Sequence, residues 1–384
     1  MREVAILGIG QTAVDEHWDK SLKELAGEAS IAAISEANLK RVDAIFVGNM
    51  LSGMLSKQEN IGVLLSDWLG IPGPETIKVE AACGSGAAAF RNGLISVASG
   101  EVDTALVVGV EKMTESLPIE TTEALSTAAD ADYEAVFGLS FVSINALVMQ
   151  RYLHVYGWSH TDFARFSINA HANALHNPNA RLHLAITESE YNQARMIAAP
   201  INLLDASPIG DGAAAIILVP AEKLSPCTPF IAVAGSGAAT DTISVHSRKD
   251  PLWLSAAAKS VKIAYQQARV TPTDIDLFEL HDAFSIMSAL SLEACGFAER
   301  GQAPRLAIEG EICPSGRIPI TTRGGLKARG HPVGATGVYQ LVEVVQQLRG
   351  EAGDTQIVDA KIGMAQNIGG SGASIITHIL QKKN

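Results

Sequence analysis

Cys83 is the first residue whose type and position predict chemistry. It lies in a corner, residues 79–89, where a short apolar run meets small residues that lead into a helical pattern from Phe90 to Ser99. A thiol at the amino end of a helix faces unpaired backbone N–H groups and the positive end of the helix dipole, and both lower its pKa. Because most free cysteines are buried and structural, this stretch alone leaves both a reactive and a structural Cys83 open.

A second corner of the same design lies far downstream, at residues 324–337. It contains a glycine-rich turn, then His331, then a helical pattern. Histidine titrates near neutral pH, which suits it to accept a proton from a thiol. A cysteine and a histidine on matching corners would form a nucleophile and base pair, whereas a capping role in the turn is the competing interpretation of His331.

The two corners lie in segments that repeat one another. The apolar run at 276–280 corresponds to the run at 43–46, and the glycine-rich run at 370–376 corresponds to the run at 210–216. Strand and helix patterns alternate in both segments, which predicts an α/β layered fold. An internal duplication of this kind would bring the Cys83 corner and the His331 corner together in space.

The repeats divide the chain into two predicted halves. The N-terminal half is residues 1–225 and the C-terminal half is residues 226–384, with a proline-containing linker at the boundary. Residues of about 116–200 interrupt the first half with long helical patterns and few strand signals. We expect this stretch to form an insertion that lies over the sheet.

Four motifs carry a resemblance to the thiolase superfamily. They are the Cys83 corner, His281-Asp282-Ala283-Phe284, the GHPVGATG run at 330–337 and the tail from Asn367 to Gly372. The motifs follow the family order over essentially the whole chain, which is most similar to archaeal and bacterial acetoacetyl-CoA thiolases related to the sterol-carrier-protein type. The resemblance implies a thiolase fold: two duplicated βαβαβ-type halves in a five-layered αβαβα arrangement, with a helical loop-domain insertion over the active site.

The resemblance also implies roles for the site residues. Cys83 would be the nucleophile that forms an acyl-cysteine, and His331 would be the base. One oxyanion hole would consist of the backbone N–H groups of Cys83 and Gly369, and a second would consist of His331 and His281. His281 follows an apolar run at 277–280, at the carboxyl end of a predicted strand, where the sites of α/β proteins collect.

The sequence departs from the common family pattern at Asn367. Most thiolases have a second cysteine there, which moves the proton at the α-carbon of the substrate, and sterol-carrier-type relatives often have one at the place of Ala283. An amide is no base at neutral pH, so the proton must go to a histidine, which we favour, or to Cys295 or Cys313. A Cys-His-His set also resembles the ketoacyl synthases, which keeps decarboxylative condensation open.

Coenzyme A thioesters are the substrates that the resemblance implies, with no covalently bound cofactor. Basic residues near the corners and in the insertion are candidates for binding CoA, and a serine in a glycine-rich loop is a candidate for contacting the pantetheine arm. These residues are Arg181, Arg195, Arg323, Lys327, Arg329 and Ser236. For each basic residue taken alone, an ordinary surface charge is the favoured interpretation. The four cysteines lack CxxC spacing and the histidines at 154–183 match no standard ligand set, which argues against a metal site.

The composition fits a folded enzyme. The chain has 384 residues, of which 47% are hydrophobic and 18% charged, and this allows a large core rather than a disordered chain. A net charge of −12 argues against nucleic-acid binding, although a local basic cluster could still bind an anion such as CoA. No apolar run is long enough for a membrane span and neither end resembles a targeting signal, so we expect a cytoplasmic protein.

Together these features predict an acetyl-CoA C-acetyltransferase, an acetoacetyl-CoA thiolase that joins two acetyl-CoA by Claisen condensation or runs the reverse thiolysis. A longer-chain 3-ketoacyl-CoA thiolase and a weakly active or inactive acyl-CoA-binding scaffold are the alternatives. The resemblance further implies a place in the mevalonate pathway and a homodimer or tetramer. It also implies assembly with hydroxymethylglutaryl-CoA synthase through a zinc-containing OB-fold protein, to which the zinc would belong.

Overall fold

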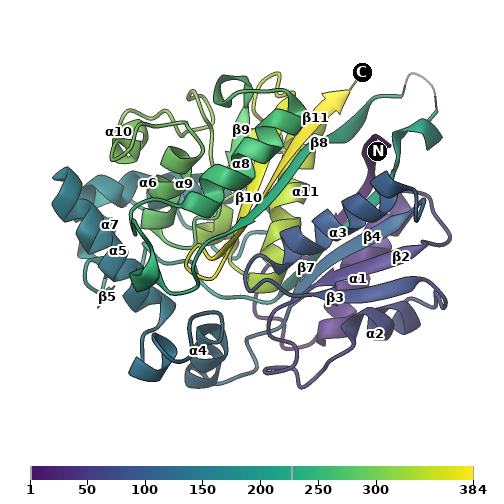
Figure 1. The fold of residues 1–384 in the computed structure, drawn as a ribbon, viewed down its shortest axis with the longest axis horizontal. Coiled ribbons are helices and arrows are strands. Elements are labelled where there is room, and N and C mark those ends of the chain that lie inside the picture. The colour runs from purple at the N-terminus through teal and green to yellow at the C-terminus, as the bar shows by residue number, and fades with distance from the viewer. Residues whose placement is uncertain (1, 226–227, 384) are drawn as a thin grey trace.

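A nine-stranded mixed sheet forms the centre of the protein (Figure 1). The computed structural model describes residues 2–225 and 228–383, and all elements below lie within them. Across the sheet the strands follow in the order β3-β2-β4-β7-β1-β8-β11-β10-β9. Their bounds are β1 Val4–Gln11, β2 Ala44–Gly48, β3 Glu75–Val79, β4 Ala105–Glu111, β7 Gly212–Pro220, β8 Phe230–Thr240, β9 Leu277–Glu279, β10 Ile362–Gly369 and β11 Ser374–Lys383.

The two halves of this sheet repeat one pairing scheme. In the first half β2 is parallel to β3 and β4, and β7 is antiparallel to β4 and β1. In the second half β10 is parallel to β9, and β11 is antiparallel to β10 and β8. A parallel bridge between Phe278 and Ile320 stands where β3 stands in the first half. The duplication predicted from the sequence is therefore confirmed, and β1 joins β8 through the pairs Ala5–Ala232 and Ile6–Ile231.

Helices cover the sheet and separate its two halves. The helix α1 (Leu22–Glu36) packs on β1 and β7, and α8 (Ser255–Ala268) packs in the same way on β8 and β11. Between the halves, α3 (Ser85–Ser99) contacts α11 (Thr336–Arg349). The outer layers also contain α2 (Ile61–Trp68) and α9 (Ser285–Ala294). This arrangement is the predicted five-layered αβαβα fold.

The contact between α3 and α11 explains the small residues of both corners. A Cβ at Gly86 would lie 2.9 Å from Gly334 O, and a Cβ at Gly337 would lie 2.4 Å from Ala87 N. No side chain fits between the helices at these points, because protein interiors are already close-packed. The two central helices thus bring together the segments that precede them, and these segments contain Cys83 and His331.

The helical insertion expected at about 116–200 is present between β4 and β7. Its elements are α4 Pro118–Ser126, α5 Phe141–Tyr156, α6 Ala164–Ala174, α7 Glu188–Gln193 and the short strands β5 Met196–Ala198 and β6 Ile201–Asn202. In Figure 1 most of it lies in blue and teal beside the C-terminal half of the sheet. The predicted boundary between the halves, 225/226, adjoins residues 226 and 227, which lie outside the described residues, so it stays a prediction.

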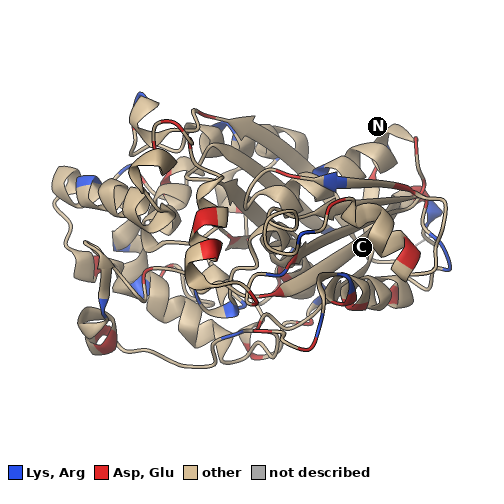
Figure 2. Ribbon diagram, turned by 90° about the horizontal axis from the view of Figure 1, so that it is seen from below, with Lys and Arg blue, Asp and Glu red and all other residues tan. Residues whose placement is uncertain are grey.

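Charged residues of both signs are distributed over the molecule. Figure 2 shows Lys and Arg interspersed with Asp and Glu along the ribbon. Among the described helices, none combines the length and the apolar character needed to cross a membrane.

Candidate active site

Cys83 lies at a tight corner between β3 and α3. Just before it, Ala82 adopts a left-handed backbone conformation (φ 52°), and just after it, Gly84 is the N-cap residue of α3. Ser85 fixes this turn, because its Oγ accepts a hydrogen bond from Ala81 N–H at 2.9 Å and donates one to Ala82 O at 2.6 Å. The corner therefore presents Cys83 from a well-defined backbone.

The turn that precedes His331 is longer than the turn at Cys83. A π-helical turn, Gly325–Arg329, lies between Gly324 and Gly330, which both have a φ of 105°. L-residues with a side chain rarely adopt this conformation, so glycine is needed at these two positions. The His331 N–H then donates to Pro208 O at 3.0 Å, which ties the corner to the segment that enters β7.

Thr336 orients the His331 ring. Its Oγ1 donates to Pro332 O at 3.3 Å and lies 2.7 Å from His331 Nδ1. We assign the hydroxyl proton to Pro332 O, which makes Thr336 an acceptor for the ring and puts the imidazole proton on Nδ1. The lone pair of His331 is therefore on Nε2, as a base requires.

His281 lies beside His331 at the end of β9. The two rings meet edge to face with their centroids 5.1 Å apart. On the other side of His281, its Nδ1 lies 3.0 Å from Nδ2 of Asn367, which is on the adjacent strand β10. Both residues are buried.

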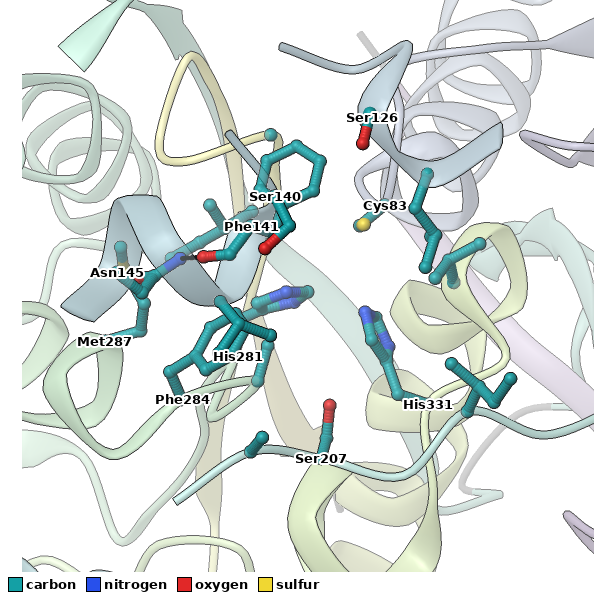
Figure 3. Close-up of a pocket in the computed structure, with 18 of the residues that line it drawn as sticks. Cys83, Ser126, Ser140, Phe141, Asn145, Ser207, His281, Phe284, Met287 and His331 are labelled. Atoms are coloured by element: carbon teal, nitrogen blue, oxygen red, sulfur yellow. Dashed lines mark hydrogen bonds between the residues drawn. The ribbon is translucent and has the colours of Figure 1, made fainter. Parts of the chain in front are cut away.

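Cys83, His281 and His331 line one pocket with a volume of about 180 Å³. Figure 3 shows the His331 ring pointing toward the Cys83 sulfur, with His281 beside it. The insertion and α9 close the pocket with a largely apolar wall, to which Leu125, Phe141, Val142, Ile209, Phe284 and Met287 contribute. The structure thus brings the three predicted side chains to one space that is partly shielded from water.

The Cys83 thiol is protonated in this environment. Burial is the main reason that its pKa is raised to about 12, and the nearby Glu111 carboxylate raises it further. Backbone N–H groups of Cys83 and Gly370 act in the opposite direction, but they do not offset burial. The expectation of a lowered pKa from the helix end alone is therefore wrong. Cys83 must lose its proton during the reaction, to a base within reach.

Both histidines of the pocket are neutral. Burial lowers the pKa of His281 to about 3, and the positive charge of Arg329 adds to this effect. Burial also lowers the pKa of His331 well below its usual value, with contributions from His281 and Arg329. A neutral imidazole can accept a proton, so His331 suits the part of a base.

The Glu111 carboxylate contacts the His331 corner and lies near the Cys83 thiol. It accepts hydrogen bonds from Met50 N–H, Leu51 N–H and Gly334 N–H, each at 3.0 Å. Gly334 belongs to the His331 corner, and the Glu111 charge acts on the Cys83 thiol. The sequence analysis did not single out Glu111, although its position at the carboxyl end of an apolar strand is a usable signal.

Gly369 and Gly370 lie against the Cys83 corner at the end of β10. A Cβ at Gly369 would lie 2.3 Å from Ala81 O, so only glycine fits there. Gly370 lines the pocket, and its backbone N–H acts to lower the pKa of the Cys83 thiol. Gly369 as an oxyanion donor stays a prediction, and the Gly370 N–H is a second candidate.

Three of the basic residues proposed to bind CoA are buried. Arg323 donates to Ala352 O at 2.8 Å, Lys327 donates to the backbone oxygen of Asp205, and Arg329 pairs with Glu343 at 2.8 Å. None of the three lines the pocket. A buried, paired cation has no free face for a phosphate group, so the structure does not support these contacts.

The other predicted CoA contacts also lie away from the pocket lining. Ser236 is buried and accepts from Arg91 at 2.7 Å, and Arg181 pairs with Glu16 at 2.5 Å. Arg195 is exposed on the insertion and remains a candidate. Cys295 and Cys313 do not line the pocket either, so Cys83 is the one cysteine among the described residues that lines it.

Five polar pocket residues were missed by sequence reasoning: Thr122, Ser126, Ser140, Asn145 and Ser207. Asn145 lies in α5. Ser207 lies in the segment before β7, and its own backbone N–H donates a hydrogen bond to Ala283 O at 2.9 Å. None of the five belongs to a recognisable motif, so no local signal distinguishes them from surface residues. Within the described residues, no group of three or more His, Cys, Asp or Glu side chains is arranged to hold a metal ion.

Comparisons with known proteins show which families this chain resembles. The thiolase N-terminal domain family matches residues 4–222, and the thiolase C-terminal domain-like family matches residues 237–382. A protein named acetyl-CoA acetyltransferase from Methanothermobacter thermautotrophicus is 42% identical over 385 residues, 100% of each chain. Its namesake from Methanocaldococcus jannaschii is 37% identical, again over 100% of each chain. Benzoylsuccinyl-CoA thiolase subunit BbsB of Thauera aromatica is 28% identical, over 96% of this chain and 95% of its own.

Solved structures share the fold at low sequence identity. An Ltp2-ChsH2(DUF35) aldolase chain matches with a TM-score of 0.86 and 23% identity, over 99% of this chain and 97% of that one. Human mitochondrial 3-ketoacyl-CoA thiolase in complex with CoA matches with a TM-score of 0.77 and 16% identity, over 100% of this chain and 98% of that one.

Proposed function

Since the chain belongs to the thiolase family and is an acyltransferase, we propose that it is an acetyl-CoA C-acetyltransferase that makes and cleaves acetoacetyl-CoA. The observation that carries the proposal is the placement of Cys83, His331 and His281 around one pocket. Thiolases use CoA thioesters as substrates without a cofactor. The names of the relatives at 42% and 37% identity support acetyl-CoA as the acyl donor.

The first half-reaction would acylate Cys83. His331 Nε2 takes the thiol proton while the sulfur attacks the carbonyl carbon of acetyl-CoA. The resulting oxyanion lies between the backbone N–H of Cys83 and that of Gly369 or Gly370. When the carbon–sulfur bond to CoA breaks, the CoA thiolate takes the proton from His331. The raised pKa of Cys83 fits this order, because the thiolate forms only as attack begins.

The second half-reaction would join the acetyl group to a second acetyl-CoA. A base removes a proton from the methyl carbon of that molecule, and the enolate attacks the acetyl-cysteine carbonyl. The bond between the carbonyl carbon and Cys83 then breaks and releases acetoacetyl-CoA. His331 and His281 have ring nitrogens in the pocket, and these can accept the proton and donate a hydrogen bond to the enolate oxygen.

The assay for this function is the formation of acetoacetyl-CoA from acetyl-CoA, and of acetyl-CoA from acetoacetyl-CoA and CoA. We expect both directions in the wild type and neither in Cys83→Ala. Loss of the product with a folded Cys83→Ser variant would confirm that the thiol is needed. Turnover that survives Cys83→Ala would contradict the proposal, because within residues 2–225 and 228–383 Cys83 is the one cysteine that lines the pocket.

A longer-chain 3-ketoacyl-CoA thiolase is the second candidate. The apolar wall of Phe141, Phe284 and Met287 favours it, since such a wall can hold an alkyl chain. Thiolysis of acetoacetyl-CoA and of straight-chain 3-ketoacyl-CoA substrates with longer chains should be compared by kcat/KM. A preference for acetoacetyl-CoA supports the first proposal, and a rise with chain length supports the second.

We also propose a homo-oligomer, a dimer or tetramer, that supplies acetoacetyl-CoA to the mevalonate pathway. The edge strand β3, with Ile77 44% exposed, supports self-association because an uncovered strand edge can pair with a second copy. Light scattering after size exclusion tests the oligomer. Assembly with hydroxymethylglutaryl-CoA synthase and a zinc-containing OB-fold protein rests on the sequence resemblance, and co-purification of the three proteins tests it.

A further inference from the structure

Asn367 makes a contact that has a chemical consequence for His281. Its Nδ2 lies 3.0 Å from His281 Nδ1, and the two residues are 1% and 3% exposed. Asn367 is part of β10, and His281 lies just beyond the end of the neighbouring parallel strand β9. The pairing of β9 with β10 therefore fixes the positions of both residues, and water has little access to the contact between them.

The direction of this hydrogen bond follows from the groups involved. An amide nitrogen can only donate, so His281 Nδ1 must accept and carry the lone pair. Because burial keeps His281 neutral, its single ring proton is then on Nε2. His331 has the opposite form, since its Nδ1 carries the proton that bonds Thr336 and its Nε2 has the lone pair. One ring of the pair is thus a donor and the other a base.

Oδ1 of Asn367 is buried and accepts no hydrogen bond from the described residues, so the partial charges around it decide how the amide is oriented. Oδ1 lies next to Gly337, where an added Cβ would come within 2.4 Å of it. Gly337 is in the first turn of α11, where the helix dipole is positive and backbone N–H groups are unpaired. An amide oxygen, with its partial negative charge, is more stable there than an NH₂ group. Reversal of the amide would place the NH₂ group against the positive end of the helix.

We propose that Asn367 is a positioning residue that holds His281 in the Nε2–H form, so that His281 donates to the enolate oxygen and His331 is the base in both half-reactions. This inference rests on the proposed condensation and names the proton carrier for its second half. It gives Asn367 a function at the place where the family pattern has a cysteine. The amide is suited to it because it neither gains nor loses a proton near neutral pH.

The proton steps balance under this assignment. The C–H bond at the methyl carbon of the second acetyl-CoA breaks, the proton goes to His331 Nε2, and the electron pair moves to the thioester oxygen, which His281 Nε2–H holds. The enolate carbon then bonds to the acetyl carbonyl carbon on Cys83. As the carbon–sulfur bond breaks, the Cys83 thiolate takes the proton back from His331.

The experiment compares Asn367→Asp with Asn367→Ala. Aspartate has the shape of asparagine but accepts from Nδ1–H, which moves the lone pair of His281 to Nε2 and removes the donor. We expect acetoacetyl-CoA synthesis to fall about 10²–10³-fold in Asn367→Asp, the effect of losing one oxyanion donor. Asn367→Ala leaves the ring unconstrained and should lose less. A purely structural role predicts the reverse order, since alanine leaves a cavity and aspartate does not.

Two further readouts separate this inference from the proposed function. Acetylation of Cys83 by acetyl-CoA, followed by intact mass, does not use His281 and should persist in both variants, which also shows that they are folded. Nitrogen NMR of ¹⁵N-histidine-labelled protein should show His281 as Nε2–H in the wild type and Nδ1–H in Asn367→Asp.

The outcomes are distinct. If wild-type Cys83 is not acetylated, the proposed function fails. If acetylation persists, two results would overturn the inference about Asn367 and leave the proposed function standing. One is slower condensation in Asn367→Ala than in Asn367→Asp. The other is a wild-type His281 that carries its proton on Nδ1.

Discussion

The Cys83 corner and the His331 corner occupy equivalent places in the two halves but are built differently. The Cys83 corner passes from β3 to α3 in five residues, 80–84, with Ala82 as its left-handed residue. The His331 corner needs a π-helical turn and the left-handed glycines Gly324, Gly325 and Gly330 before α11 begins. The two halves thus share the same strand and helix arrangement, but the turns between strand and helix differ.

The surroundings of the corners differ even more. Behind the His331 corner lies a buried group of charged side chains, among them Arg329, Glu343 and Glu279. Burial, followed by repulsion from Glu343, raises the pKa of Glu279 to about 8. Small apolar residues surround much of the Cys83 corner, with Glu111 as the nearby charge. We infer that a nucleophile needs only a firm backbone and a partner base, whereas the base itself must be oriented and kept neutral.

The largest expected effect concerns the base. His331→Asn keeps a polar side chain but removes proton transfer, so acetylation of Cys83 should slow by about 10²–10⁴-fold. Rapid quenching followed by intact mass measures this rate. A loss below about tenfold would show that Cys83 is activated by its own corner, and the division of labour between the corners would be wrong.

The second prediction concerns the state of the thiol. With its pKa raised to about 12, Cys83 should react with iodoacetamide faster by about tenfold for each pH unit between roughly pH 6 and 9, because only the thiolate reacts. The rate is followed by the mass of the alkylated protein, with Cys83→Ala as the control for other cysteines. A plateau in this range would instead indicate a thiolate–imidazolium pair in the resting enzyme.

The third prediction tests the buried charged residues behind the His331 corner. Arg329→Met leaves the Glu343 carboxylate buried and unpaired, which should lower the free energy of unfolding by about 3–5 kcal/mol. The double variant Arg329→Met/Glu343→Met removes both charges and should recover most of this loss. Urea unfolding measures both. Equal stability of the single variant and the wild type would contradict a paired role for these charges.

Thr336 gives a smaller effect on the same corner. Thr336→Val removes the partner of His331 Nδ1–H without changing the shape, and a buried donor left unpaired costs about 1–3 kcal/mol, or about 5- to 150-fold in the acetylation rate. Thr336→Ser restores the hydroxyl and should restore the rate. If serine and valine slow the reaction equally, the methyl group rather than the hydroxyl is what matters.

The smallest effect concerns the backbone of the Cys83 corner. Ala82 has a φ of 52°, and glycine there should raise the free energy of unfolding by about 1 kcal/mol. The matched control is Ala88→Gly within α3, which should lower it by about 0.5–1 kcal/mol. Thermal unfolding of both variants provides the measurement. The same sign in both would mean that Ala82 is not strained.

Much of the fold could be predicted because its signals are local. The apolar run at 104–110 and the helical pattern at 21–37 correspond to Ala105–Glu111 and Leu22–Glu36. The helix expected from Phe90 begins earlier, at Ser85, and its first turn packs closely against α11. The pairing of β1 with β8 could not be predicted, since it joins distant segments.

The site was predictable in its nucleophile and histidines but not in its electrostatics. Convergence of Cys83 and His331 in one pocket followed from the repeats. The sequence analysis named Lys327 and Arg329 as candidate CoA contacts or surface charges, and it missed their burial because their partners, Asp205 and Glu343, are distant in the chain. The raised pKa of Cys83 was missed for the same reason, since burial depends on tertiary packing.

The central claim is that Cys83 carries the acyl group with His331 as its base. Intact mass after brief incubation with acetyl-CoA tests it most directly, on the wild type, Cys83→Ala and His331→Asn side by side. We predict one acetyl group on the wild type, none on Cys83→Ala and only slow labelling of His331→Asn. No acetyl group on folded wild-type protein, or equal labelling of Cys83→Ala, would contradict the account.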